Sequence, residues 1–106
     1  MNFRGGMGEL MRQAGRVQRK VEKRREELRE ETFEARAGND KVTAIANGIP
    51  ELAEIRIDKT LLEEEDIEMV QDLVVAAANA ALTKAREHVD AEIEKITGGL
   101  SIPGIG

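Results

Sequence analysis

A long stretch with helical spacing, residues 7–31, places the strongest constraint on how this chain can fold. Its apolar side chains alternate in steps of three and four, the pattern of a coiled-coil seam, and they are Met7, Leu10, Ala14, Val17, Val21 and Leu28. Arg24 and Glu31 occupy the two seam positions that lack an apolar side chain. No proline interrupts the stretch, and most of its residues are good helix formers. We therefore predict a helix over residues 9–31.

Basic side chains follow one side of this predicted helix. The row at i, i+4 spacing consists of Arg12, Arg16, Lys20 and Arg24. Arg19 and Lys23 lie one position away from that row. Three glutamates lie within reach of the cations in the second half of the helix, whereas the first half lacks such partners. Unpaired cations repeating every ~6 Å along a rigid helix would suit a polyanion. From the residues alone, an ordinary solvated face explains the same charges equally well.

The composition bounds the rest of the chain. With 106 residues it forms a single domain over 1–106, and a core without Trp or Tyr and with only two Phe is small. A domain of this size gains buried area by sharing its core with a partner, so we expect an oligomer. The absence of cysteine fits the cytosol, no segment is long enough to span a membrane, and we find no signal peptide. We expect a cytoplasmic protein.

The charge is distributed unevenly along the sequence. The whole chain carries a net charge of −5. Residues 1–25 contain eight Lys or Arg and two Glu, which gives +6, and residues 26–106 contain eight basic and nineteen acidic residues, which gives −11. Any polyanion would therefore bind the first helix, and the acidic remainder would orient the protein on it by repulsion.

The middle of the chain changes to a period of two, which is typical of half-buried strands. We predict a three-stranded antiparallel sheet over residues 32–57, with turns at 38–40 and at Asn47-Gly48. In the third strand, strict alternation would place Leu52 on the face opposite to Ile55 and Ile57. We therefore expect a β-bulge near Ala53-Glu54.

A second long helix is predicted over residues 65–97. The acidic run 63–66 precedes it, which favours a helix N-terminus rather than a metal site, because consecutive carboxylates rarely converge on one ion. Its apolar stripe is Ile67, Val70, Val74, Ala77, Ala81, Ala85, Val89, Ile93 and Ile96. Glycines and short apolar residues at the ends predict a flexible leader over 1–8 and a flexible tail over 98–106.

The sequence contains no arrangement of residues that is typical of a catalytic site. The single histidine, His88, has no cysteine or catalytic motif near it, and the single serine, Ser101, lies in the predicted tail. A Ser/His/Asp site would need a rigidly held nucleophile. No zinc, redox or dinucleotide motif occurs. We expect no enzyme activity, no cofactor, no metal and no small-molecule substrate.

Taken in order, several stretches of the chain resemble the YbaB/EbfC family of bacterial nucleoid-associated proteins. They are 6–14 (GMGELMRQA), 37–38 (AG), 41–43 (KVT), 47–48 (NG), 57–63 (IDKTLLE) and 73–81 (LVVAAANAA). The resemblance implies an α+β homodimer shaped like tweezers, with a long N-terminal helix, a three-stranded antiparallel sheet and a long C-terminal helix. It also implies a nucleoid protein that binds duplex DNA and can influence DNA compaction and gene expression.

The resemblance and the charge pattern agree on the first helix as the DNA-binding element. The residues that we predict to contact DNA are Arg12, Arg16, Arg19, Lys20 and Lys23. Glu51 and Glu54 make the third strand more acidic than is usual for the family, so we do not expect DNA contact through the sheet. Lys and Arg contacts to phosphate carry no base code, so low sequence specificity is expected. The competing interpretation is an interaction adaptor whose basic helix docks an acidic partner protein.

Overall fold

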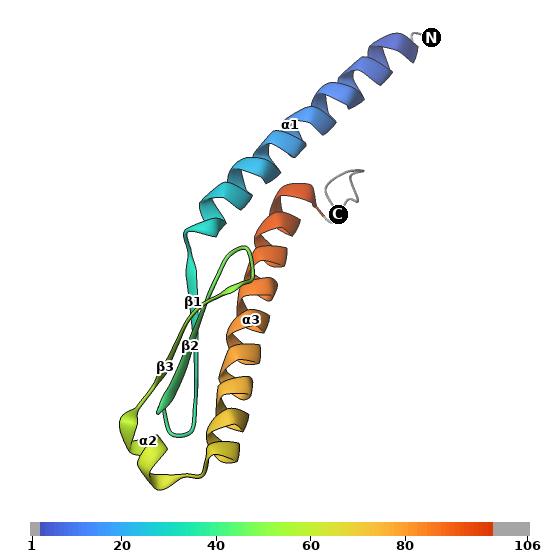
Figure 1. The fold of residues 1–106 in the computed structure, drawn as a ribbon. Helices are drawn as coiled ribbons and strands as arrows, with labels where there is room; N and C mark the ends of the chain where they lie inside the picture. Colours follow the sequence, from blue (N-terminus) through green and yellow to red (C-terminus); the bar gives the residue numbers. More distant parts are fainter. Residues whose placement is uncertain (1–2, 99–106) are drawn as a thin grey trace.

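A computed structural model describes residues 3–98, and the side chains of residues 6–98. It confirms the α+β class, with one long helix projecting from a body made of a sheet and a second long helix (Figure 1). In chain order the elements are α1 (Phe3–Arg29), β1 (Thr32–Ala37), β2 (Val42–Asn47), β3 (Leu52–Ile57), α2 (Lys59–Glu64) and α3 (Ile67–Thr97).

The three strands form an antiparallel sheet in the order β1-β2-β3. Residues 38–40 all adopt positive φ, and the turn they form joins β1 to β2. Between β2 and β3 the register shifts, because Ile45 pairs with Glu54 whereas Ala46 pairs with Leu52. Ala53 is thus the extra residue of a bulge, as the sequence predicted. The bulge brings the apolar side chains of β3 onto the face of the sheet that α3 covers.

The main core lies between the sheet and α3. Alternate residues of β2 are buried against the helix, and the alanine-rich stripe of α3 allows the helix to approach the strands closely. The buried residues of this core are Phe33, Val42, Ala44, Ala46, Leu61, Val70, Ala77, Ala81 and Ala85. Burial of alternating strand residues is the pattern expected for a sheet with one covered face.

A second, smaller core joins α1 to α3. Val21 and Leu28 on α1 are buried against Val89 and Ile93 on α3. These two α1 residues belong to the seam that the sequence showed. Only the C-terminal half of α1 therefore packs on the body, and the N-terminal half extends past the end of α3 (Figure 1).

The elements differ from our predictions at both ends of α1, which ends at Arg29 rather than at residue 31, in the segment between β3 and α3, and at the start of α3, which is Ile67 rather than residue 65. Helix α1 begins at Phe3, so most of the segment expected to be a flexible leader is helical. Once the helix is formed from residue 9 onward, each added residue gains a hydrogen bond and loses the conformational entropy of that one residue. The glycines of this segment make the extension less favourable, but they do not prevent it. Residues 59–64 form the short helix α2, and Asp66 caps α3 through a 2.8 Å bond from Met69 N. The predicted tail, apart from the C-cap Gly98, lies outside the described residues.

Candidate nucleic-acid interface

The N-terminal half of α1 forms an arm that stands clear of the body. The molecule measures 76 × 19 × 17 Å along its principal axes. The seam side chains of the arm are exposed, with 63% of Met7 and 64% of Leu10 accessible, whereas Val21 is only 1% accessible. A helix of 27 residues is about 40 Å long and strands of six residues span about 20 Å. The body is too short to cover all of α1.

Two of the predicted DNA-binding residues are engaged in surface ion pairs. Arg12 Nη2 lies 2.9 Å from Glu9 Oε2, and Arg16 Nη2 lies 3.2 Å from Glu9 Oε1. The prediction that the first half of the helix lacks acidic partners is therefore wrong for these two arginines, since one glutamate serves both. All three side chains remain about half exposed or more. Such exposed pairs contribute only ~0–1 kcal/mol, so a phosphate can replace the glutamate.

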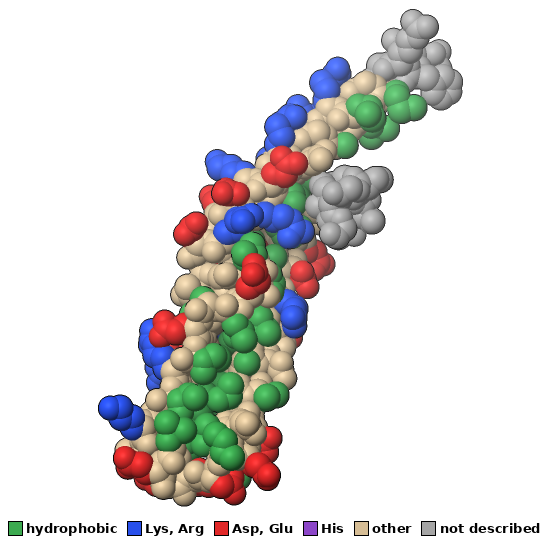
Figure 2. Space-filling view, in the orientation of Figure 1, with side chains coloured by type: hydrophobic (Ala, Val, Ile, Leu, Met, Phe, Trp, Pro, Cys, Tyr) green, Lys and Arg blue, Asp and Glu red, His purple; other side chains and the backbone are tan. Residues whose placement is uncertain are grey.

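The other three predicted residues, Arg19, Lys20 and Lys23, are exposed. Within residues 6–98, the structure places no acidic group within ion-pair distance of their charged atoms. Figure 2 shows Lys and Arg side chains along the outer edge of α1. We name the five residues Arg12, Arg16, Arg19, Lys20 and Lys23 the arm stripe, which begins on the arm and continues along the outer face of the packed half of α1. Their positions on the helix turn them away from the apolar seam.

Arg24, by contrast, belongs to the fold. Its side chain is only 28% exposed, and its Nη2 lies 2.6 Å from Glu92 Oε1 on α3. Hydrogen bonds from Lys95 and Arg24 lower the pKa of Glu92 to about 2. The bond to Glu92, together with the charges of Glu31 and Glu27, raises the pKa of Arg24. A charged residue therefore occupies a seam position because α3 offers a carboxylate there.

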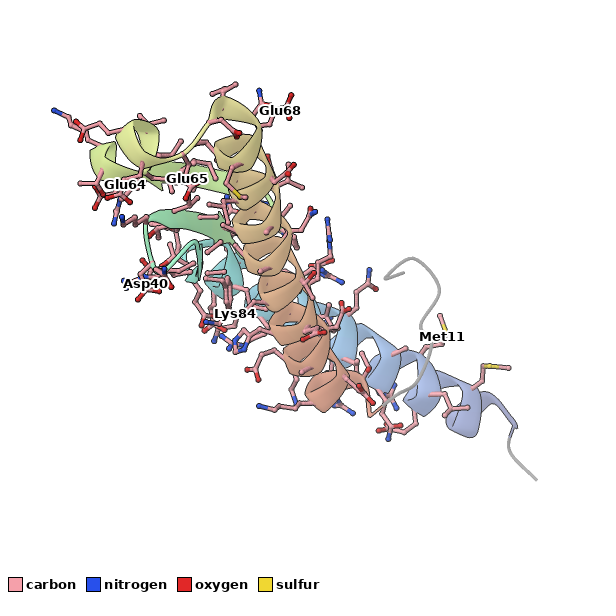
Figure 3. All side chains as sticks on the ribbon, turned by 90° about the horizontal axis from the view of Figure 1, so that it is seen from below. Met11, Asp40, Glu64, Glu65, Glu68 and Lys84 are labelled. Atoms are coloured by element: carbon pink, nitrogen blue, oxygen red, sulfur yellow. The ribbon has the colours of Figure 1, made fainter. Side chains whose placement is uncertain are left out.

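The opposite end of the molecule is acidic. Glu64, Glu65 and Glu68 lie at the junction of α2 and α3, far from the arm (Figures 2 and 3). Lys41 Nζ lies 2.7 Å from Glu64 Oε2, and this hydrogen bond raises the pKa of Lys41. The basic arm and the acidic end give the protein a dipolar charge distribution, which would favour the approach of a polyanion from the arm.

The uncovered face of the sheet has little net positive charge. Arg36 is 3.3 Å from Glu34, and Arg56 pairs with Glu54 two residues away. Each exposed arginine of these strands thus has its own carboxylate. The absence of DNA contact through the sheet stays a prediction.

His88 lies at the junction of α3 with the sheet and α1. Its ring packs against Phe33 with centroids 5.2 Å apart, and its Nε2 lies 3.6 Å from Glu31 Oε1. Neither contact provides a nucleophile or a metal ligand set. In residues 6–98 no group of three or more His, Asp or Glu side chains is arranged to hold a metal ion. None of the described helices combines the length and hydropathy needed to cross a membrane.

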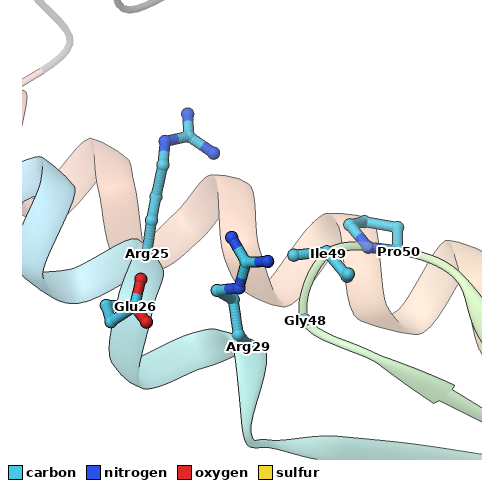
Figure 4. Close-up of a pocket in the computed structure, with 6 residues that line it drawn as sticks. All are labelled: Arg25, Glu26, Arg29, Gly48, Ile49 and Pro50. Carbon is cyan, nitrogen blue, oxygen red and sulfur yellow. The ribbon is translucent and has the colours of Figure 1, made fainter.

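A pocket that the sequence did not reveal lies where α1 meets the β2–β3 loop. It has a volume of about 300 Å³ and is lined by Arg25, Glu26, Arg29, Gly48, Ile49 and Pro50 (Figure 4). The i, i+4 spacing of the two arginines is visible in the sequence. Their closeness to a loop some twenty residues further along the chain is a tertiary feature that the sequence pattern does not encode.

Comparison with known proteins identifies the family. The sequence model of the YbaB/EbfC DNA-binding family matches residues 3–100. The chain belongs to the YbaB/EbfC DNA-binding family. The match runs from the first described residue of α1 to beyond the end of α3, so it includes the arm stripe, the sheet and the second long helix.

Relatives within the family cover almost the whole chain. A nucleoid-associated protein of Myxococcus xanthus is 47% identical over 96 residues, which are 91% of this chain and 91% of the relative. A nucleoid-associated protein of Acetivibrio thermocellus is 49% identical over 104 residues, 97% of this chain and 92% of the relative. An uncharacterized Helicobacter pylori protein of known structure has the same fold, with a TM-score of 0.62 at 24% identity over 71% of this chain and 87% of its own.

Proposed function

We propose that this protein is a nucleoid-associated protein that binds duplex DNA through the arm stripe. The observation that carries the proposal is the position of five exposed cations on a helix that projects beyond the body. Membership in a DNA-binding family supports a nucleic acid as the polyanion. The acidic end supports a defined orientation, since it repels the duplex and leaves the arm to approach it.

Binding through the stripe would have low sequence specificity. Lys and Arg side chains neutralise phosphates, and phosphate contacts position a protein on DNA without reading its bases. The chain contains only two aromatic side chains of the Phe, Tyr and Trp class, so it lacks the platforms on which single-stranded bases stack. Duplex DNA in the nucleoid is therefore the ligand that matches the arm stripe. Binding of the protein along this DNA would change DNA compaction and gene expression.

The active form in this proposal is a homodimer. Large apolar side chains of β3, α2 and the first half of α3 are exposed, and Figure 2 shows apolar atoms gathered on the body below the arm. They are Leu52, Ile57, Leu62, Ile67, Met69 and Val75. Exposed apolar area of this kind marks an interaction surface, and β3 is an edge strand that needs protection. A second copy would enlarge a small core and would present two arms to one duplex.

The test of DNA binding is a salt series with a random duplex of about 30 base pairs. Neutralising Arg19, Lys20 and Lys23 to Gln removes three cations for which residues 6–98 provide no ion-pair partner. We expect affinity to fall at least about tenfold, and the slope of log K against log salt to decrease by roughly 0.9 for each lost phosphate contact.

The matched control neutralises Arg36, Lys59 and Arg86 to Gln, which makes the same change in net charge away from the arm. Equal losses for the two triple variants would show that net charge, rather than the stripe, governs binding. No duplex binding by the unaltered protein even at low salt would reject the proposal and favour the adaptor interpretation.

A measurement of the molar mass in solution tests separately whether the protein forms a homodimer. Replacing Leu52 and Val75 by Glu places charges on β3 and α3, where both side chains are about half exposed in the single chain, at 43% and 57%. We expect a folded monomer by light scattering and weaker DNA binding, because one arm binds without the avidity of two. A dimer of unchanged mass would place the interface elsewhere.

A further inference from the structure

The pocket between α1 and the β2–β3 loop has the features of a site built in advance of its ligand. Gly48 is buried, and a Cβ at this position would lie 1.8 Å from the carbonyl oxygen of Leu28. The loop thus rests directly on the backbone of α1. The Asn47 side chain accepts hydrogen bonds from Ile49 N and Glu51 N, each at 3.1 Å. These contacts hold the loop in one conformation beside the helix.

The pocket presents two cations and an apolar wall. Arg25 and Arg29 lie one turn apart on α1, and both are exposed. Over the described part of the chain, no carboxylate is within ion-pair distance of either guanidinium. Ile49 and Pro50 form the opposite wall, and 39% of Ile49 is accessible (Figure 4). Guanidinium groups bind phosphate oxygens in pairs of hydrogen bonds, and an apolar wall suits the sugar beside a phosphodiester.

This cationic pair does not continue the arm stripe. At about 100° of rotation per residue, Arg25 and Arg29 lie roughly 120–160° around α1 from the centre of the stripe. Glu22 and Glu26 lie between the two basic surfaces on the helix. A duplex that follows the stripe would have to cross these carboxylates to reach the pocket. The pocket therefore remains accessible while the stripe is occupied.

We propose that the pocket is a second DNA phosphate-binding site, which takes a phosphodiester group of another duplex segment while the stripe holds the first. This inference rests on the proposed DNA-binding function and adds a mechanism to it: one protein connects two duplexes. The second site is the weaker of the two, because it has two cations where the stripe has five and Glu26 lies in its lining. Bridging therefore requires prior occupancy of the stripe.

The experiment is a two-duplex capture. One duplex is fixed to beads, the protein is added, and retention of a fluorescent second duplex is measured beside ordinary affinity for a single duplex. For Arg25→Gln with Arg29→Gln we expect capture to fall about tenfold or more, since two charge-assisted contacts are lost. Affinity for the single duplex should stay within about twofold, because screened charges off the contact surface contribute little.

Three other variants show which surface holds which duplex. Glu26→Gln removes the carboxylate from the pocket and should increase capture of the second duplex, which a folding defect would not do. Arg36→Gln with Arg86→Gln removes two exposed arginines elsewhere and should leave capture unchanged. Neutralising Arg19, Lys20 and Lys23 should reduce both capture and single-duplex affinity, because the first duplex is no longer held.

The outcomes separate this proposal from the proposed function. Unchanged capture in the Arg25, Arg29 variant would overturn the second site, and so would an equal loss in capture and single-duplex affinity, which would place the pocket on the first duplex. A fall in molar mass of that variant would assign the arginines to the subunit interface instead and would also overturn it. Failure of the unaltered protein to bind any single duplex would reject the DNA-binding function itself.

Discussion

The two halves of α1 carry the same apolar pattern in opposite environments. In the C-terminal half, Leu28 is fully buried against α3, whereas in the N-terminal half Leu10 is 64% exposed. The helical period is continuous across both halves. Periodicity therefore predicts the helix and the side of it that is apolar, but the length of the neighbouring elements decides which part of that side is covered.

The ion pairs of the two halves also differ in their exposure to solvent. In the packed half, Arg24 bonds Glu92 across the helix–helix contact. In the projecting half, Arg12 and Arg16 share Glu9, and all three side chains remain accessible to solvent. A buried or half-buried arginine is fixed by the fold, whereas an exposed one can exchange its carboxylate for a phosphate at little cost. The comparison assigns a structural role to the face of the packed half that meets α3, whereas the outer face of α1 stays exposed along both halves and carries the five residues of the arm stripe.

The largest effect expected from this comparison is on stability. Leu28→Ala should lower the free energy of unfolding by about 2–5 kcal/mol, since it leaves a cavity in the smaller core. Leu10→Ala is the matched change in the arm and should stay within about 0.5 kcal/mol. Denaturant titrations followed by circular dichroism measure both. A large loss for Leu10→Ala would show that the arm seam is covered in solution, as by a second subunit.

A second prediction concerns the contact between the packed half and the β2–β3 loop. Gly48→Ala would place a Cβ 1.8 Å from the Leu28 carbonyl oxygen, and overpacking of this kind costs about 1–3 kcal/mol. We expect a lower denaturation midpoint together with weaker capture of a second duplex, because the loop must move away from α1. Unaltered stability would mean that the loop is not held against the helix.

The charge network of the packed half gives a prediction for pH. Lys95 first, and Arg24 second, lower the pKa of Glu92 from 4.5 to about 2. Because the folded-state pKa is depressed, the stabilisation is present above pH 4.5 and is lost as the pH falls from 4.5 toward 2. Glu92→Gln should therefore be less stable than the unaltered protein at neutral pH, and the difference should narrow over that range.

A double-mutant cycle tests whether the network accounts for this dependence. In an Arg24→Gln background one of the two partners of Glu92 is absent. The loss of unfolding free energy caused by Glu92→Gln should therefore be smaller, and this loss should depend less steeply on pH between 4.5 and 2. Identical pH dependence with and without Arg24 would assign the whole shift to Lys95. The contact between α1 and α3 would then make no electrostatic contribution through this pair.

Much of the fold could be predicted from local patterns. The sheet over residues 32–57 and the bulge at Ala53 follow from a period of two and its interruption, which are properties of consecutive residues. The stripe of α3 followed from helical spacing in the same way. The start of α1 at Phe3 could not be predicted, because three glycines argue locally against a helix that propagation from its neighbours nevertheless extends.

The candidate site could be predicted only in part. The arm stripe is a pattern within one helix, so its cations were visible in the sequence. Their engagement by Glu9 depends on rotamers, and Glu9 reaches Arg16 from seven positions away. The pocket depends on the packing of Gly48 against Leu28, and no local pattern contains that contact. The sequence therefore revealed the arm stripe, which lies on one helix. It did not reveal the pocket, which forms only where α1 and the β2–β3 loop meet.

The smallest expected effect separates local from global stability. Gly15 lies at the junction of the two halves, and a Cβ there would meet only the flexible end of Arg19 at 3.4 Å. Gly15→Ala should stabilise the helix locally by about 0.8–1 kcal/mol without changing the denaturation midpoint, because the arm adds nothing to the core. Hydrogen exchange would report slower exchange of amides in residues 6–15. A higher midpoint would contradict an independent arm, since the two halves of α1 would then unfold as one unit.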